Sequence, residues 1–326
     1  MEDCKNSAIG LVLTNRPSRF LLRCAEKPAL PRSPRTTGDS LREYTNRGYG
    51  VDIDVLGALA VRENGIPVTP SAPKPRQVLA LLALHADQVV PVALLIEELW
   101  GERPPRSART TLQTYILQLR ELISVALEHD PEDAEPRTAK DVLVTMPGGY
   151  LLKTSGGASD VREFEKLAGT GYRAMDAEDF PGAARQLRDA LALWSGSALV
   201  DIQAGPQLEL EIRRLEETRL CALYQRIEVD LRLGRHRELL GELTVLVSRH
   251  RTHENLHGQL MLALHRSGRR GEALDVYQRL RHSLVRDLGL EPSVGLRRLQ
   301  RSILMAAPEP ALEVPVAGGE RLSRVG

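Results

Sequence analysis

Arginine, threonine and glutamine side chains gather in the segment RSARTTLQTYILQLRELI, residues 106–123, whose apolar residues recur at helical spacing. Arginine can donate two hydrogen bonds to guanine, glutamine can pair with adenine, and a threonine methyl group can contact that of thymine. The amides at the start of a helix also favour phosphate groups. These residue types predict contact with DNA, although an amphipathic helix with a solvated polar side has a similar composition.

A helical projection separates the two sides of this segment. With Leu112 at zero and a turn of about 100° per residue, the apolar residues Tyr115, Ile116, Leu119, Leu122 and Ile123 all lie within about 80° of it. The opposite side carries Arg106, Thr110, Gln113, Thr114, Leu117 and Glu121, and Arg109 and Arg120 lie at its flank. Four arginines and no carboxylate lie between Glu102 and Glu121, so this side is locally positive. An exposed Leu117 is unfavourable in water, and contact with a thymine methyl group would explain it.

No residue pattern predicts catalysis. The chain contains no GxSxG, HExxH or GxxxxGK[ST] motif, and we therefore expect no enzymatic activity and no cofactor. His250, His253 and His257 could share one side of a helix, but they lack the cysteine or carboxylate partners of a metal site, and we expect His253 and His257 on an exposed surface. Cys221 lies in a long amphipathic segment, where a buried thiol is the simpler interpretation.

Composition indicates a globular intracellular protein. The 326 residues are 42% hydrophobic and have a formal net charge of only +1, so an argument for DNA binding depends on local charge. The three cysteines, Cys4, Cys24 and Cys221, are scattered, which favours a reducing cytoplasm over a disulfide framework. No apolar run approaches the roughly 20 residues of a membrane span. We expect a cytoplasmic, nucleoid-associated protein without membrane contact.

The elements around the opening segment follow a recognisable order. Alternating residues from Val51, with a turn at Asn64-Gly65, predict short strands in a meander. RQVLALLALHAD predicts a buried helix, and VALLIEELWG predicts a short helix that stops at Gly101. The opening segment is the third helix, with Ser107 as its N-cap, and DVLVTMPGGYLLKT predicts a hairpin. This order is typical of a winged helix-turn-helix, whose third helix enters the major groove.

The remainder of the chain predicts stacked helices. Residues 160–304 are almost entirely helical in period, and LRLGRHRELLGEL resembles LHRSGRRGEALDVY, with Gly234 and Gly268 separated by 34 positions. That spacing is the tetratricopeptide period, and AEDFPGAARQL is an earlier partial copy. The fold class is therefore mainly α, an N-terminal α+β winged helix-turn-helix followed by an all-α tetratricopeptide-like domain.

We assign the boundaries of these parts from changes in composition. Residues 51–155 form the expected DNA-binding domain and residues 160–304 the expected helical domain. Residues 1–48, rich in Arg, Pro, Ser and Thr, are expected to be a disordered extension, and residues 305–326 a flexible tail. The acidic stretch VALEHDPEDAEP is expected to be a solvated loop.

Three stretches resemble the Streptomyces antibiotic regulatory protein (SARP) family, the activators of antibiotic gene clusters. They are LIEELWGERPPRSARTTLQTYILQLR, PGGYLL and DLGLEPSVGLRRLQRSIL, and the last, with the repeats before it, resembles that family's bacterial transcriptional activation domain. The resemblance covers residues 51–304. It implies a pathway-specific transcriptional activator that binds direct repeats in double-stranded DNA upstream of promoters. It also implies a helical domain that supports a homodimer and contacts RNA polymerase and its sigma factor.

The resemblance also assigns site residues. Arg106, Arg109, Thr110, Gln113, Thr114 and Arg120 fall in the recognition-helix motif, and Lys74 and Arg76, just before the first helix, are placed for phosphate contact. Two departures concern the site: the helix ends in LQLRE without a further basic residue, and the wing tip Thr145-Met146-Pro147 lacks an arginine.

Two other functions fit the same elements. One is a helical-repeat adaptor whose winged helix contacts protein instead of DNA, and the other is a sensor that holds a small molecule on the concave surface of the repeats. A steep loss of affinity with rising salt would indicate phosphate contacts and so favour DNA binding over the adaptor.

Overall fold

The described part of the chain begins with a small antiparallel meander. The computed structural model describes residues 50–129 and 137–305. Strand β1 (Val51–Asp54) pairs with β2 (Ala60–Glu63), which pairs with β3 (Ile66–Pro67). The turn between β2 and β3 places Asn64 at φ 51° and Gly65 at φ 82°, the positive values that a tight hairpin turn requires. The predicted meander is confirmed. The expected extension, residues 1–48, lies outside the described residues, as do 130–136 of the acidic stretch and 306–326 of the tail.

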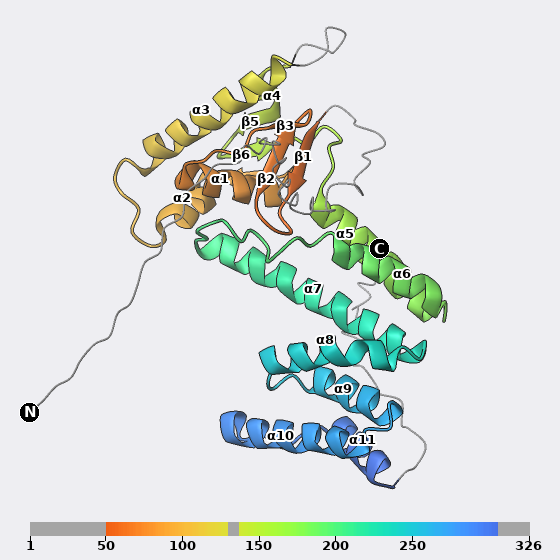
Figure 1. Cartoon of the computed structure of the whole chain (residues 1–326). Helices are drawn as coiled ribbons and strands as arrows, with labels where there is room; N and C mark the ends of the chain where they lie inside the picture. Colours follow the sequence, from red (N-terminus) through yellow and green to blue (C-terminus); the bar gives the residue numbers. More distant parts are fainter. Residues whose placement is uncertain (1–49, 130–136, 306–326) are drawn as a thin grey trace, which may run out of the picture. The chain divides into compact units, whose positions relative to one another are not determined.

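Three helices and a second sheet follow the meander. The helices are α1 (Pro73–Leu84), α2 (Val92–Trp100) and α3 (Ala108–Leu127), and the predicted hairpin is β5 (Leu143–Met146) with β6 (Gly149–Leu152). Sequence patterns missed two short elements, α4 (Ala139–Val142) and β4 (Val89–Pro91), of which the latter pairs with β6 to give the order β4-β6-β5. Both are too short for a period to be read, since they hold four and three residues. The arrangement is that of a winged helix-turn-helix (Figure 1).

The apolar side of α3 anchors this region. Leu112, Ile116, Leu119 and Ile123 are each no more than 2% exposed and belong to one hydrophobic core with residues of α1 and α2. Burial of each such side chain contributes about 1.5–3 kcal/mol. The helix is therefore held by the face that the projection assigned to the interior, which leaves the opposite face outward.

Beyond the hairpin, the regular elements of the described range are all helices, and Ser159 makes an isolated bridge to Ile53. The helices are α5 (Asp160–Asp176), α6 (Phe180–Ala192), α7 (Pro206–Arg232), α8 (His236–Arg249), α9 (Glu254–Arg266), α10 (Arg270–Leu288) and α11 (Val294–Met305). Neighbours in sequence pack against each other from α5 to α10, and Figure 1 shows them stacked in chain order. A second hydrophobic core joins residues of α7 to α11. The mainly α fold predicted from the sequence is confirmed.

The repeat has a conformational basis. Gly234 and Gly268 lie two residues before α8 and α10 and take φ values of 77° and 78°. Glu178 occupies the same place before α6 with φ 58°. The left-handed conformation is readily adopted by glycine and is strained for other residues, which explains why the glycines make the last two copies visible in the sequence and the first copy only partial.

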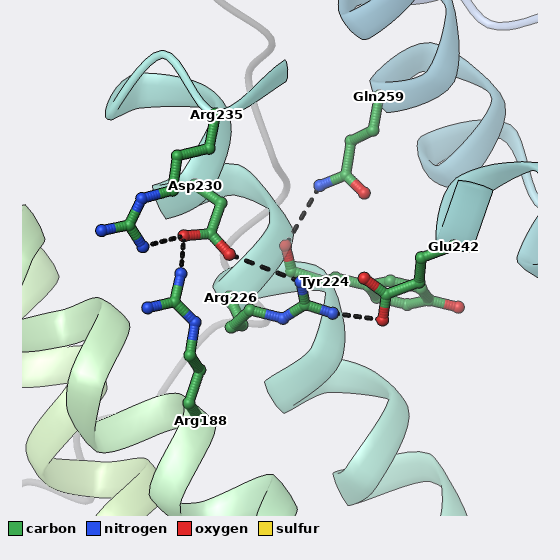
Figure 2. A network of polar contacts seen from close by, with 7 residues as sticks. All are labelled: Arg188, Tyr224, Arg226, Asp230, Arg235, Glu242 and Gln259. Carbon is green, nitrogen blue, oxygen red and sulfur yellow. Dashed lines mark hydrogen bonds and ion pairs between the residues drawn. The ribbon is translucent and has the colours of Figure 1, made fainter. Parts of the chain in front are cut away.

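A polar network joins successive helices of the stack (Figure 2). The carboxylate of Asp230 in α7 is 2% exposed and accepts hydrogen bonds from Arg188 of α6, Arg226 of α7 and Arg235 at the start of α8. Arg226 also pairs with Glu242 of α8. A buried carboxylate is unfavourable unless it is paired and hydrogen-bonded, so this network selects one packing of the three helices.

Three expectations about single residues in the helical region are wrong. His257 is buried, 6% exposed, and His253 is half-buried, because α9 passes between α8 and α10 and has little solvent-facing surface. Burial lowers the pKa of both imidazoles. Cys221 is exposed, because α7 turns this position outward. Among the described residues, no group of three His, Cys, Asp or Glu side chains is arranged to hold a metal ion.

A buried carboxylate of α2 connects the winged helix to the helical region. Glu98, 2% exposed, accepts hydrogen bonds from the amides of Gly205 (2.6 Å), Gln207 (2.9 Å) and Leu208 (3.0 Å) at the start of α7. The side chain of Gln77 donates a further bond of 2.6 Å. A negative charge at a helix N-terminus satisfies amides that have no partner within the helix. Glu98 therefore caps α7 from another part of the chain.

A second carboxylate makes a similar connection at the start of α5. Asp160, 8% exposed, accepts hydrogen bonds of 2.7 Å from the amides of both Val55 and Leu56, which follow β1. Burial raises the pKa of this carboxyl to about 6, in spite of those two bonds, which act in the opposite direction.

Candidate nucleic-acid interface

The first turn of α3 presents its amides without a side-chain cap. Ser107 occupies the predicted N-cap position, but its hydroxyl makes no capping hydrogen bond. The amide of Thr111 donates to Ser107 O, at 2.9 Å, and that of Ala108 to Pro105 O. The amides of Arg109 and Thr110 have no acceptor among the described residues. Open amides at a helix N-terminus suit a phosphate group.

The outward face of α3 carries most of the predicted contacts. Arg106, Arg109, Thr110, Gln113 and Thr114 are all exposed, and Leu117 is 56% exposed. Within the described part of the chain, the side chains of Arg106, Arg109 and Gln113 form no hydrogen bond or ion pair, whereas the Thr114 hydroxyl donates to Thr110 O at 3.1 Å. The structure brings these six residues together on one surface and leaves the three long polar side chains available to a partner.

Arg120 lies in a different environment from the exposed arginines of α3, and its contact with DNA stays a prediction. Its Nε and Nη2 donate to Leu143 O at 3.0 and 2.7 Å, and Nη2 also donates to the hydroxyl of Thr145 at 2.8 Å. The guanidinium group thus fixes α3 to strand β5 of the wing. The arginine missing from the wing tip is not replaced by Arg120, because its donors are directed to the hairpin backbone.

Lys74 and Arg76 are also engaged within the chain. Lys74 Nζ donates to Leu99 O at 2.8 Å and to the side chain of Gln77. Arg76 pairs with Asp201, and its guanidinium also donates to Leu59 O at 3.2 Å. These contacts pack α1 against α2 and against the helical region. Both residues lie in the first turns of α1 and not before the first helix as expected, and their contact with phosphate stays a prediction.

The predicted contacts omitted one residue of the surface. Gln118 is exposed and follows Thr114 by one helical turn. Its direction in the projection, about 120° from Leu112, is as far from the apolar side as that of Arg106, so the helical period was a sufficient signal to include it. The wing tip at Pro147-Gly148 is a tight turn with Gly148 at φ 81°, preceded by Met146, which is 37% exposed.

The fold and this surface define a class of protein. A winged helix-turn-helix whose third helix presents uncommitted arginine and glutamine side chains, joined to tetratricopeptide-like repeats, has the architecture of a transcriptional regulator. Residues 68–134 match the family described as transcriptional regulatory protein, C terminal, and residues 159–304 match the bacterial transcriptional activator domain. None of the helices in the described ranges is long and apolar enough to cross a bilayer.

Similar proteins identify the family. The regulatory protein DnrI of Streptomyces peucetius is 51% identical over 84% of this chain and 100% of its own length. The regulatory protein AfsR of Streptomyces coelicolor is 36% identical over 85% of this chain, which corresponds to only 26% of AfsR. The chain belongs to the Streptomyces antibiotic regulatory protein family of transcriptional activators, as the sequence motifs predicted.

A solved structure shares the fold. Mycobacterium tuberculosis EmbR, in complex with a low affinity phosphopeptide, superposes with a TM-score of 0.72 at 32% sequence identity, over 80% of this chain and 66% of EmbR. The likeness supports the arrangement of a winged-helix region followed by a helical domain.

Proposed function

We propose that this protein binds promoter DNA in a sequence-specific manner and activates transcription of a secondary-metabolite gene cluster, as a cytoplasmic, nucleoid-associated protein without catalytic activity. The observation that carries the proposal is the outward face of α3, where Arg106, Arg109 and Gln113 are exposed and have no partner among the described residues. Exposed guanidinium and amide groups on the outward face of the third helix of a winged helix-turn-helix suit the edges of bases in the major groove.

The described contacts suggest different roles for the residues of α3 in binding DNA. The open amides of Arg109 and Thr110 and the charge of Arg106 would hold phosphate groups. The side chains of Arg109 and Gln113 would read bases, and Leu117, 56% exposed, would meet a thymine methyl group. Arg120 would act indirectly, since it holds α3 against the wing.

The helical region supplies the second half of the proposal. We propose residues 51–155 as the DNA-binding domain and residues 160–304 as the domain that supports a homodimer and contacts RNA polymerase and its sigma factor. Support comes from the match of residues 159–304 to the bacterial transcriptional activator domain. Two copies on direct repeats would place their α3 helices about one helical turn of DNA, or a multiple of it, apart.

Binding measured as a function of salt tests this function. Purified full-length chain is first used to select bound fragments from genomic DNA, and affinity for the selected duplex is compared with that for a duplex in which the direct repeats are scrambled. We expect the selected duplex to bind at least about a thousandfold more tightly than the scrambled one, and both affinities to fall steeply with salt. Failure to enrich any repeat, with affinity independent of salt, would favour the adaptor.

A further inference from the structure

The outward face of α3 carries a carboxylate to which the proposed contacts assign no role. Glu121 is exposed, and its side chain forms no hydrogen bond or ion pair with any residue that the structure describes. The positions three and four residues away on either side carry no charge; they are Leu117, Gln118, Ser124 and Val125. Arg120, the neighbour of Glu121 in the chain, donates instead to strand β5. The packing of α3 therefore does not account for this carboxylate.

Glu121 lies at the centre of the face proposed to meet DNA. With a turn of about 100° per residue, it points about 180° away from Leu112, whose side chain is buried in the core. Thr110 and Thr114 point within about 20° of the direction of Glu121, and Leu117 within about 40°. A helix that presents Thr114 and Leu117 to the edges of bases therefore presents Glu121 one turn further along the same groove.

A carboxylate in the major groove matches one base better than the other three. It has acceptor oxygens and no donor, so it is repelled by the acceptors N7 and O6 of guanine and O4 of thymine. Adenine places the acceptor N7 beside its N6 donor, an arrangement that suits an amide, whereas the only hydrogen-bonding group of cytosine in this groove is its N4 amino group. Nearby phosphates also repel the carboxylate, and a hydrogen bond from N4 compensates for its loss of water.

We propose that Glu121 is a specificity-determining residue that accepts a hydrogen bond from N4 of a cytosine. The helix axis rises by about 12 Å from Gln113 to Glu121, so this cytosine lies about three or four base pairs from the base that Gln113 reads. The bonds from Arg120 to the wing hold this turn of α3 in place. The inference rests on the proposed function, because it names part of the sequence that α3 selects.

Selection of binding sites from a randomised duplex library tests the assignment. Purified full-length parent and Glu121→Gln are each used to enrich bound sequences. We expect the parent to select a repeat with a cytosine that Glu121→Gln replaces with adenine, because a glutamine amide can pair with both N6 and N7 of adenine. The other positions of the repeat should stay the same. Selection of one identical sequence by both proteins would overturn the proposal.

Fluorescence anisotropy measures the preference at that base pair. Replacement of the C·G pair by T·A should weaken binding of the parent by at least about fivefold and that of Glu121→Ala by less than about twofold. Glu128→Gln removes an equal charge from an exposed position on the same side, about 10 Å further along the chain, and should retain the preference of the parent. Loss of the preference in Glu128→Gln would show a general effect of charge and contradict the role of Glu121.

A modified base tests which atom donates. N4-methylcytosine still pairs with guanine, but its methyl group takes the place of the N4 hydrogen that faces the major groove. In the selected duplex it should weaken binding of the parent by at least about fivefold and change that of Glu121→Ala by less than about twofold. Equal weakening of both proteins would show that another part of the chain meets this position, and the assignment to Glu121 would be wrong.

The selection experiment also separates this inference from the proposed function. A parent chain that enriches no sequence would contradict both. A parent that enriches a repeat, together with a Glu121→Gln variant that enriches the identical repeat, would contradict the role of Glu121 alone. Urea unfolding of Glu121→Gln serves as the control for folding, and its midpoint should match that of the parent because the side chain is exposed.

Discussion

The arginines of α3 show how the environment of a side chain decides its role. Arg109 and Arg120 lie on one helix within a few turns of each other, and both fall in the recognition motif. Arg109 is exposed without a partner among the described residues, whereas Arg120 donates to Leu143 O and to Thr145. Residue type therefore identifies candidates for base contact, and the acceptors around each side chain determine which candidates remain free.

The first prediction concerns the proposed base contacts. Arg109→Ala and Gln113→Ala should each weaken binding to the selected duplex by about 1–3 kcal/mol, because each removes a bidentate contact to a base. Affinity for the scrambled duplex should change much less. Ser124→Ala, at an exposed position near the end of the same helix, is the matched control. Unchanged footprints in both variants would contradict the assignment of these contacts.

Arg120→Ala should act mainly on stability. Its removal leaves the carbonyl of Leu143 and the hydroxyl of Thr145 without the guanidinium donors, and we expect a loss of about 1–2 kcal/mol in the free energy of unfolding. Arg109→Ala should change that free energy by less than about 0.5 kcal/mol, since its side chain is exposed. Urea denaturation measures both. Equal stability of the two variants would show that the Arg120 contacts with the wing are weak.

At the scale of the elements, the stability of the helical repeats depends on the turns between helices as well as on the apolar faces that the helices bury. Gly234 and Gly268 adopt positive φ two residues before α8 and α10, and a Cβ atom at either position would meet nothing within 4 Å. Steric crowding therefore does not select glycine here. The requirement comes from the left-handed backbone alone, which reverses the chain between antiparallel helices.

Two glycine substitutions distinguish the need for a left-handed backbone at Gly268 from the general cost of glycine flexibility. Gly268→Ala should lower the free energy of unfolding by about 1 kcal/mol, because the left-handed conformation is strained for alanine. Gly241→Ala, inside α8 and equally open around its Cβ, should instead raise it by about 0.5–1 kcal/mol through better helix propensity. Thermal and urea unfolding measure the two signs. Stabilisation by both substitutions would contradict the backbone argument.

For the whole molecule, carboxylates join segments that are distant in sequence, and two of them, Glu98 and Asp160, are buried. Glu98 caps α7, Asp160 binds the amides after β1, and Asp201 pairs with Arg76 and accepts from the amide of Leu59. Each of these bonds links the winged-helix region to the helical region. The two regions therefore share their stability, and a change in one is expected to affect the other.

Glu98→Ala tests this coupling. The substitution leaves three amides at the start of α7 without their acceptor. It also removes one of the two acceptors of Gln77 Nε2, which still donates to Glu98 O. We expect a loss of about 2–4 kcal/mol in the free energy of unfolding. Glu97→Ala, at the exposed neighbouring position, should change it by less than about 0.5 kcal/mol. Urea unfolding followed by circular dichroism compares them. A similar midpoint for both variants would rule out Glu98 as a structural link.

Titration of Asp160 should make the stability of the link between β1 and α5 depend on pH. Its pKa is about 6 in the folded chain against an ordinary 3.8, so the folded state binds more protons between these values and stability falls as pH rises through that window. Asp160→Asn removes the titration and keeps an acceptor oxygen. The difference in unfolding free energy between variant and parent should shift in favour of the variant by about 2–3 kcal/mol from about pH 4 to about pH 7. Parallel pH profiles would contradict the raised pKa.

The sequence by itself determined the elements, because their evidence is local. The period of the apolar residues in α3, the turn at Asn64-Gly65 and the 34-residue spacing of Gly234 and Gly268 each involve residues within one element or one repeat. Short elements such as β4 were not predicted, because three residues are too few to show a period. The outward face of α3 was also predictable, because its apolar residues can be buried in only one direction.

Only the tertiary structure decided which charged groups are free. Arg76 is held by Asp201 and Arg120 by a carbonyl of the wing, while Glu98 is buried against α7. These partners lie from 23 to 125 residues apart in the chain, and no local pattern specifies them. Charged groups recognise each other over a few ångströms in space. Only the packing of the helices therefore shows which cations are paired within the chain and which remain available to DNA or to a partner.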